Sequence, residues 1–211
     1  MQRIYSVGER VADGTIHVIG VVGGLIAATA LVTVAIMTLP VSETVSVAVY
    51  AVAMVAMFGF SAAYNVIDFP QWKETLRRYD QAAIFAKIAG TYTPLAFAKI
   101  GGFAGTGLLV GVWSVAVLGI VGKLALSRRW DRTSLVLYLA LGWAGVLTIG
   151  PVIDSLPLVS LVLLVIGGVT YTVGVVFHLW SSLPYQNAIW HLFVLVATAL
   201  HFSAIAWAVF E

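Results

Sequence analysis

Residues 158–180 read LVSLVLLVIGGVTYTVGVVFHLW, a stretch that contains no Asp, Glu, Lys or Arg. As an α-helix rising about 1.5 Å per residue, this stretch can cross a hydrocarbon core about 30 Å thick. The whole chain has the same character, because 61% of its 211 residues are hydrophobic and only 9% are charged. A soluble domain carries roughly a quarter of its residues as charged ones. The composition therefore predicts an integral membrane protein.

Six further apolar stretches have a similar length. The seven predicted spans are residues 15–39, 44–67, 79–98, 103–126, 133–149, 158–180 and 187–209. Short connections with proline and glycine separate most of them, as is typical of helix breakers. Pro94 lies inside the third span, where it is expected to kink the helix. The sequence thus predicts an all-α, seven-transmembrane helix bundle that forms one domain over residues 1–211.

The positive charges predict the orientation of this bundle. Nine of the eleven Lys and Arg residues fall on one side of the predicted membrane: Arg3, Arg10, Lys73, Arg77, Arg78, Lys123, Arg128, Arg129 and Arg132. Because positively charged loops stay in the cytoplasm, we expect a cytoplasmic N-terminus and an outside C-terminus. This orientation is opposite to that of G-protein-coupled receptors. The last span also has no lysine for a retinal Schiff base.

The composition excludes several kinds of site. Without cysteine, the chain forms no disulfide, thiolate zinc site or iron–sulfur centre, and any metal has to bind His, Asp or Glu. The basic residues report orientation, so we predict no nucleic-acid partner. Membrane lipids are the expected partners, and the inner (plasma) membrane of a bacterium is the expected location.

Polar residues gather at the predicted cytoplasmic ends of three spans. Ser61 and Asn65 lie four residues apart near the end of the second span, and Asp80 opens the third. Asn187 and His191, again four apart, open the seventh. Residues four apart share one face of a helix, so these side chains are predicted to meet at one depth. They are either interfacial residues bonded to loops and headgroups or a functional pocket.

Several motifs resemble those of the hemolysin III family, part of the progestin and adipoQ receptor superfamily. The matching residues are Glu9, Asp13, His17 and Gly20, then SAAYN at 61–65, Asp80, IAGTYTP at 88–94, AIWHLFV at 188–194, His201 and Phe202. Their order and spacing cover nearly the whole chain. The resemblance implies seven helices, a cytoplasmic N-terminus and a zinc ion near the cytoplasmic face.

The resemblance also implies how that zinc is held. One histidine ends a Ser-x-x-x-His motif on helix two, two form a His-x-x-x-His motif on helix seven, and an aspartate on helix three contacts the metal-bound water. Zinc held in this way suits hydrolysis of an amide or ester, and superfamily relatives are proposed to hydrolyse ceramide-like lipids. Ser61, Asp80 and His191 match, which makes Asp80 and Ser61 the candidate catalytic residues. Asn65 and Asn187 stand where histidines are expected.

The two asparagines predict a degenerate zinc site. An amide oxygen is a poor zinc ligand beside an imidazole. Losing two of three histidines therefore removes much of a binding free energy that is on the order of 10 kcal/mol in structural zinc sites. We expect neither tightly bound zinc nor another cofactor.

Two residues offer substitutes for the missing site. Lys87 lies seven residues after Asp80, so its ammonium can reach back toward Asp80 and supply positive charge, or it lines a polar cavity without meeting Asp80. His178, with His191 and Asp80, forms a second possible ligand set of two histidines and a carboxylate for a divalent metal. His17 lies at the same depth and is interpreted as structural.

The sequence therefore predicts a zinc-deficient or non-catalytic relative of metal-dependent lipid hydrolases, acting in membrane-lipid sensing or homeostasis. Its pocket comprises Asn65, Lys87, Asn187 and His191, with His191 as the retained metal position and His178 as a further one. An active metal-dependent hydrolase with a rebuilt site is one alternative. A pore-forming or cytolytic protein, which the family name suggests, is the other.

Overall fold

The computed structural model describes residues 5–125 and 131–211, apart from the side chain of Arg132. Its regular elements are α1 (Val7–Thr38), α2 (Val41–Val66), α3 (Pro70–Pro94), the π-helix η1 (Leu95–Ile100), α4 (Gly102–Ala125), α5 (Asp131–Gly142), the 3-10 helix η3 (Ala144–Thr148), α6 (Ile149–Ser155), α7 (Leu158–Leu179) and α8 (Gln186–Phe210). The all-α prediction is confirmed for the described residues. Arg3, Arg128 and Arg129, used above to predict orientation, lie outside them.

Within the part of the chain that the structure describes, six stretches are long and apolar enough to cross a membrane: α1, α2, α4, Thr133–Ser155, α7 and α8. α3 is more polar, because its first half carries Lys73, Glu74, Arg77, Arg78 and Asp80. It begins at Pro70, well before the predicted start of the third span at Tyr79, with proline at the helix start, where the missing N–H costs nothing. The chain is thus a multi-pass membrane protein whose described residues contain six spans by composition, and the seventh span stays a prediction.

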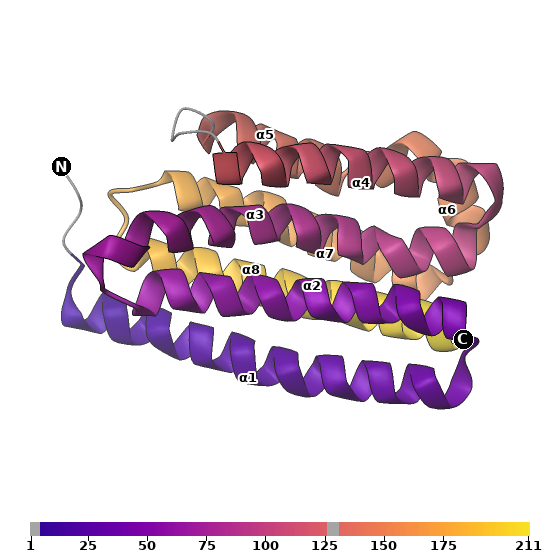
Figure 1. Ribbon diagram of the computed structural model, residues 1–211, viewed down its shortest axis with the longest axis horizontal. Helices are drawn as coiled ribbons and strands as arrows, with labels where there is room; N and C mark the ends of the chain where they lie inside the picture. The colour runs from indigo at the N-terminus through magenta and orange to yellow at the C-terminus, as the bar shows by residue number, and fades with distance from the viewer. Residues whose placement is uncertain (1–4, 126–130) are drawn as a thin grey trace.

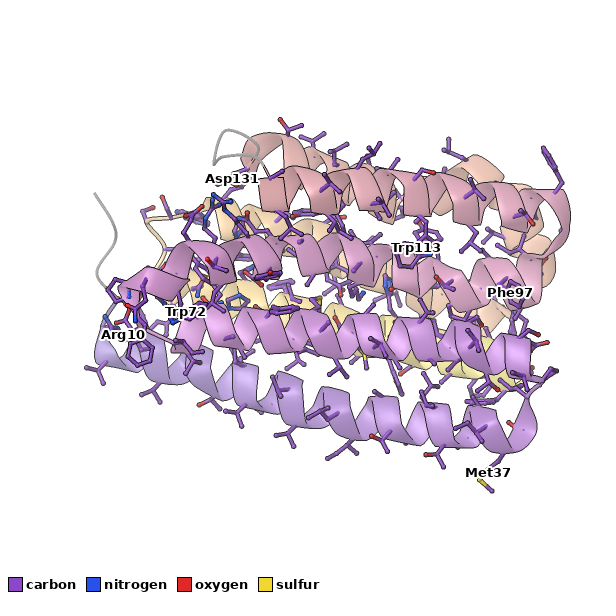
Figure 2. The ribbon with its side chains drawn as sticks, viewed as in Figure 1. Arg10, Met37, Trp72, Phe97, Trp113 and Asp131 are labelled. Atoms are coloured by element: carbon purple, nitrogen blue, oxygen red, sulfur yellow. The ribbon has the colours of Figure 1, made fainter. Side chains whose placement is uncertain are left out.

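Helices that are neighbours in sequence pack side by side, α1 on α2, α2 on α3, α3 on α4 and α7 on α8. α1 also packs against α8, which brings the first and last helices together. Figure 1 shows α4 and α5 along one edge of the bundle and α1 along the opposite edge. Figure 2 places Arg10, Trp72 and Asp131 at one end of the bundle and Met37 and Phe97 at the other. α1 therefore begins at the end that holds the basic residues Arg10 and Lys73.

The start of α1 is fixed to the connection between α7 and α8. The Ser6 hydroxyl accepts from the Glu9 N–H at 3.2 Å, and Glu9 Oε2 accepts from the Ser6 N–H at 2.8 Å, which forms a capping box. Glu9 Oε1 accepts a further bond from the Tyr185 N–H at 2.9 Å. The first turn of α1 is thereby placed beside the first turn of α8.

The fifth predicted span, 133–149, is not one continuous helix. α5 ends at Gly142, a 3-10 turn follows, and α6 continues to Ser155. Tyr92 explains the break, because its hydroxyl donates to the Gly142 carbonyl at 2.7 Å and accepts from the Gly145 N–H at 3.1 Å. The Gly142 carbonyl and the Gly145 N–H therefore bond to a side chain instead of to backbone groups of a continuous helix.

Pro94 changes the type of the helix without ending it. The chain passes from α3 directly into the π-helix η1. Proline has no N–H to donate to the preceding turn, and wider π-turns are a known response to such a disturbance. Directly before the proline, the Thr93 hydroxyl donates to the Ala89 carbonyl at 2.9 Å.

α4 passes so close to η1 that a glycine is required at the contact. A Cβ built on Gly105 would collide with the carbonyl oxygen of Ala96, whereas a Cβ on Gly107, in the same helix, meets nothing within 4 Å. We expect Gly105→Ala to lower the free energy of unfolding by about 1–3 kcal/mol through overpacking. Gly107→Ala should be neutral or slightly stabilising, because alanine favours helix over glycine. Melting temperatures in detergent measure both, and equal melting temperatures for the two variants would contradict this contact.

Candidate functional site

A cavity of about 590 Å³ lies inside the helix bundle. Along α3 its lining begins at Arg77 and continues through η1 to Ile100, a distance of more than about 30 Å of helix. Its walls are mostly apolar, and the polar lining residues concentrate at the end where α3 and α8 begin. An elongated apolar cavity with a few convergent polar groups is typical of a site for a small amphiphilic molecule.

Asp13 is the centre of the polar end. Its Oδ1 lies 2.6 Å from His191 Nδ1, and its Oδ2 accepts a hydrogen bond from Asn187 Nδ2 at 3.0 Å. Asn187 Nδ2 also donates to Asn65 Oδ1 at 3.1 Å, and Asn65 Nδ2 donates to the Ser61 carbonyl at 2.9 Å. These bonds join α1, α2 and α8. Asp13, His17, Asn65, Asn187 and His191 are called the Asp13 cluster below.

His17 completes the cluster from one turn further along α1. Its Nε2 lies 3.6 Å from Asp13 Oδ2, and its ring centroid lies 4.3 Å from that of His191. The side chain is only 4% exposed, and Nε2 has no hydrogen-bond partner. Ligand atoms of Asp13, His17 and His191 all lie within 4.8 Å of one another. Two histidines and a carboxylate are a ligand set that suits divalent transition metals.

The three-histidine zinc site implied by the resemblance does not fit these residues. Asn65 and Asn187 offer amide groups at two of its positions, and both amides are engaged in hydrogen bonds within the cluster. Two ligands of a tetrahedral zinc ion, each about 2.1 Å from the metal, lie about 3.4 Å apart. His191 Nδ1 and Asp13 Oδ1 are 2.6 Å apart, which is a hydrogen-bond distance.

The seven residues that the sequence analysis selected all line this cavity: Ser61, Asn65, Asp80, Lys87, His178, Asn187 and His191. Asn65, Asn187 and His191 belong to the Asp13 cluster, and Ser61 lies close to the Asp80 carboxyl group. The ligand-type groups gathered around His191 are Asp13 and His17, in place of the expected Asp80 and His178. The His178 ring instead lies 4.9 Å from that of Trp190.

Lys87 does not form the ion pair with Asp80 that was one of its two interpretations. Among the residues that the structure describes, no salt bridge joins them. The Lys87 ammonium lies 4.6 Å from the centroid of the Tyr171 ring, a cation–π distance, and the side chain is buried. The structure favours the other interpretation, in which Lys87 lines the cavity.

Sequence reasoning gave Asp13 no role beyond the N-terminal motif. The sequence does contain a pattern that indicates a role for Asp13. Asp13 and His17 are four residues apart, which is the same spacing as that of Ser61 and Asn65. Tyr171, which contacts Lys87 from α7, carried no comparable signal. A single tyrosine within an apolar span says nothing about which helix it faces.

A charged network, which includes Arg77 and Asp131, lines the cavity where α3, α4 and α5 meet. Arg77 Nη1 donates to Asp131 Oδ2 at 2.9 Å, and Lys123 Nζ donates to Asp131 Oδ1 at 2.8 Å and to Gln81 Oε1 at 3.0 Å. Asp131 lies just outside the apolar span Thr133–Ser155. Burial raises the pKa of this carboxyl, but the bonds from Lys123 and Arg77 outweigh burial and hold the pKa below its ordinary value. The network ties α3, α4 and α5 together.

Known proteins resemble this chain along nearly its whole length. Residues 6–202 match the family described as Haemolysin-III related. The chain belongs to this family. It is 35% identical over 199 residues to Hemolysin-3 of Bacillus cereus, across 94% of this chain and 91% of that protein. It is 34% identical over 202 residues to the Hemolysin-3 homolog of Bacillus subtilis (strain 168), across 96% and 95% of the two chains.

The similarity extends to a human protein. Monocyte to macrophage differentiation factor is 27% identical over 173 residues, across 77% of this chain and 70% of that protein. No solved structure matches the chain. Family membership confirms the resemblance drawn from the motifs, whereas the degenerate zinc site stays a prediction.

Because Lys87 and Asp80 do not pair, their contributions to stability should be independent. We expect Lys87→Met and Asp80→Asn to change the free energy of unfolding additively, with a coupling below about 0.5 kcal/mol in a double-mutant cycle. Melting of the four proteins in detergent measures the coupling. Recovery of most of the loss in the double variant would show that the two side chains meet after all.

Proposed function

We propose that this chain is a membrane-lipid sensor of the hemolysin III type that holds one lipid or lipid-derived amphiphile in its cavity. The observation that carries the proposal is the cavity itself, about 590 Å³ in volume, mostly apolar along its walls and polar at one end. An alkyl chain gains by contacting such walls, and a polar head gains by contacting the polar and charged side chains that line the cavity.

A binding role fits the cluster better than family-type hydrolysis does. The Asp13 carboxylate already accepts hydrogen bonds from two side chains of α8, and the asparagine amides link α8 to α2. Buried polar groups that are bonded to one another stabilise a helix arrangement in a membrane. The Asp13 cluster thus supports the proposal that this protein has kept the pocket of its family but not the three-histidine zinc chemistry of that family.

We further propose that α3 is a seventh span and that the polar end of the cavity faces the cytoplasm of a bacterium. α3 packs between α2 and α4 along the bundle, which supports its membrane location despite its charges (Figure 1). Among the described basic residues, Arg10, Lys73, Arg77, Arg78 and Lys123 lie at the helix ends on the side where α1 begins.

The proposed orientation predicts the location of the C-terminus. A reporter enzyme fused after Glu211 should be active outside the cytoplasm, because the basic helix ends hold the N-terminal side inside. Alkaline phosphatase, active outside, and a fluorescent protein, active inside, serve as paired fusions. Fluorescence without phosphatase activity would reverse the proposed orientation.

The proposed function predicts that a lipid occupies the cavity. Val175 lines the cavity, whereas Val173, in the same helix, does not and is 42% exposed. We expect native mass spectrometry of the purified protein to detect one retained lipid-sized molecule per chain. Val175→Trp should lower its occupancy severalfold by filling the cavity, and Val173→Trp should leave it unchanged. Equal retention by the two variants would place the lipid outside the cavity and contradict the proposal.

A second candidate function is metal-dependent hydrolysis, and the buried, unbonded Nε2 of His17 favours it. Asp13, His17 and His191 are the residues that would hold a divalent ion, after His191 and Asp13 move apart. Such an ion supplies a Lewis acid for an ester or amide carbonyl. The same mass spectra distinguish the candidates, since the hydrolase requires about one metal per wild-type chain and the sensor does not.

A further inference from the structure

Lys87 places an ammonium group deep inside the bundle. It lies about 25 Å along α3 from Pro70, near the middle of the combined α3 and η1, and its side chain is 3% exposed. No acidic side chain within residues 5–125 and 131–211 forms a salt bridge with it. A buried cation without an anionic partner is unfavourable in a membrane, so intramembrane lysines generally mark a functional site.

The groups around this ammonium are neutral. The Tyr171 ring faces it at 4.6 Å, and the Tyr171 hydroxyl bonds to Thr198 Oγ1 at 2.5 Å. His201 has its ring 5.5 Å from that of Tyr171, and its buried Nδ1 has no hydrogen-bond partner, while its Nε2 lies 3.2 Å from the Leu164 carbonyl oxygen. Lys87, Tyr171 and His201 all line the cavity. Among the described residues, this part of the wall therefore places an ammonium group at the cavity without an anion paired with it.

We propose that Lys87 binds the carboxylate of a single-chain amphiphile, a long-chain fatty acid in chemical class, whose alkyl chain lies in the apolar part of the cavity. The inference rests on the proposed function, since it names the ligand of the same cavity. A carboxylate and an ammonium that meet in a low-dielectric cavity attract each other more strongly than in water. Each group thereby relieves the burial of the other.

The charges and walls of the cavity decide which way the ligand lies. At the polar end, the Arg77 guanidinium is already paired with Glu74 and Asp131. The carboxyl groups of Asp13 and Asp80 therefore disfavour a further carboxylate at the Asp13 cluster. Asp80 lies about 10 Å from Lys87 along α3, toward that end. Beyond Lys87 the lining becomes apolar, with Leu95, Ile100 and Leu156. The alkyl chain therefore extends from Lys87 toward η1, and the head lies near the middle of the bundle.

Binding of palmitate and of hexadecanol, which has the same chain length without the charge, tests this assignment. Native mass spectrometry counts each probe on delipidated wild type, Lys87→Met, Lys87→Arg and Lys99→Met. Lys99 lies outside the cavity lining, so Lys99→Met removes a positive charge as a matched control. We expect Lys87→Met to weaken palmitate binding more than about tenfold and to leave hexadecanol unchanged. Lys87→Arg and Lys99→Met should bind palmitate as wild type does.

The outcomes separate this inference from the proposed function. Palmitate binding by Lys87→Met as tight as by wild type overturns the role of Lys87, while continued binding of both probes leaves the lipid sensor standing. If wild type binds neither probe and also purifies without a lipid, the inference and the proposed function both fail.

A measurement on the wild-type protein avoids dependence on the folding of Lys87→Met. Reductive methylation of lysine amines, read for each site by mass spectrometry, reports whether the Lys87 amine is covered. Palmitate should slow methylation of Lys87 severalfold and leave Lys99 unchanged, whereas hexadecanol should protect Lys87 much less. Equal protection by the two probes would mean that the carboxylate does not contact Lys87.

Discussion

The Asp13 carboxylate governs how this bundle is assembled at its polar end. A charged side chain at the centre of a membrane helix costs about 2.5–3.5 kcal/mol on insertion scales, and less toward the interface. Asp13 offsets this cost only where hydrogen-bond donors reach both oxygens, and Asn187 and His191 supply them from α8. α1 packs against α8, and the bond from the Tyr185 N–H to Glu9 joins the beginnings of the same two helices. Asp13 therefore adds side-chain bonds between α1 and α8 beside the polar end of the cavity.

The sequence predicts the spans well where composition alone determines them. Uniformly apolar helices such as α7 are visible because nothing but a membrane accommodates them. The break between α5 and α6 was not predictable, because it depends on Tyr92, a residue of another helix that bonds two backbone groups at the break. The early start of α3 was missed for a different reason. Charged residues such as Arg77 lower the hydropathy of α3. The salt bridge from Arg77 to Asp131 nevertheless holds α3 against α5.

The sequence predicts which residues gather near the site, but it does not predict the contacts between them. Helical spacing put Ser61 with Asn65 and Asn187 with His191, and all four line one cavity. The contacts depend on which helices are neighbours in space, which spacing within one helix does not reveal. For that reason Asp13, on the first helix, was not recognised as the partner of the last. For Lys87 the spacing allowed a reach toward Asp80 or into the cavity, and only the position of Tyr171 on α7 decides between them.

The distribution of charge along the cavity connects the two asparagines with Lys87. In the zinc site that the family resemblance implies, positive charge lies at the polar end, next to the position of Asp80. This chain has asparagines there, together with the carboxyl groups of Asp13 and Asp80. Among the described residues, the buried cations Arg77 and Lys123 are paired with Asp131. Lys87, about 10 Å deeper along α3, has no salt bridge, and Tyr171 faces its ammonium. The anionic head of the proposed ligand would therefore lie in the middle of the bundle, away from the Asp13 cluster. This charge pattern supports the proposal of a receptor for an amphiphile, because it would hold the head away from the groups that a hydrolase of the family type uses for cleavage.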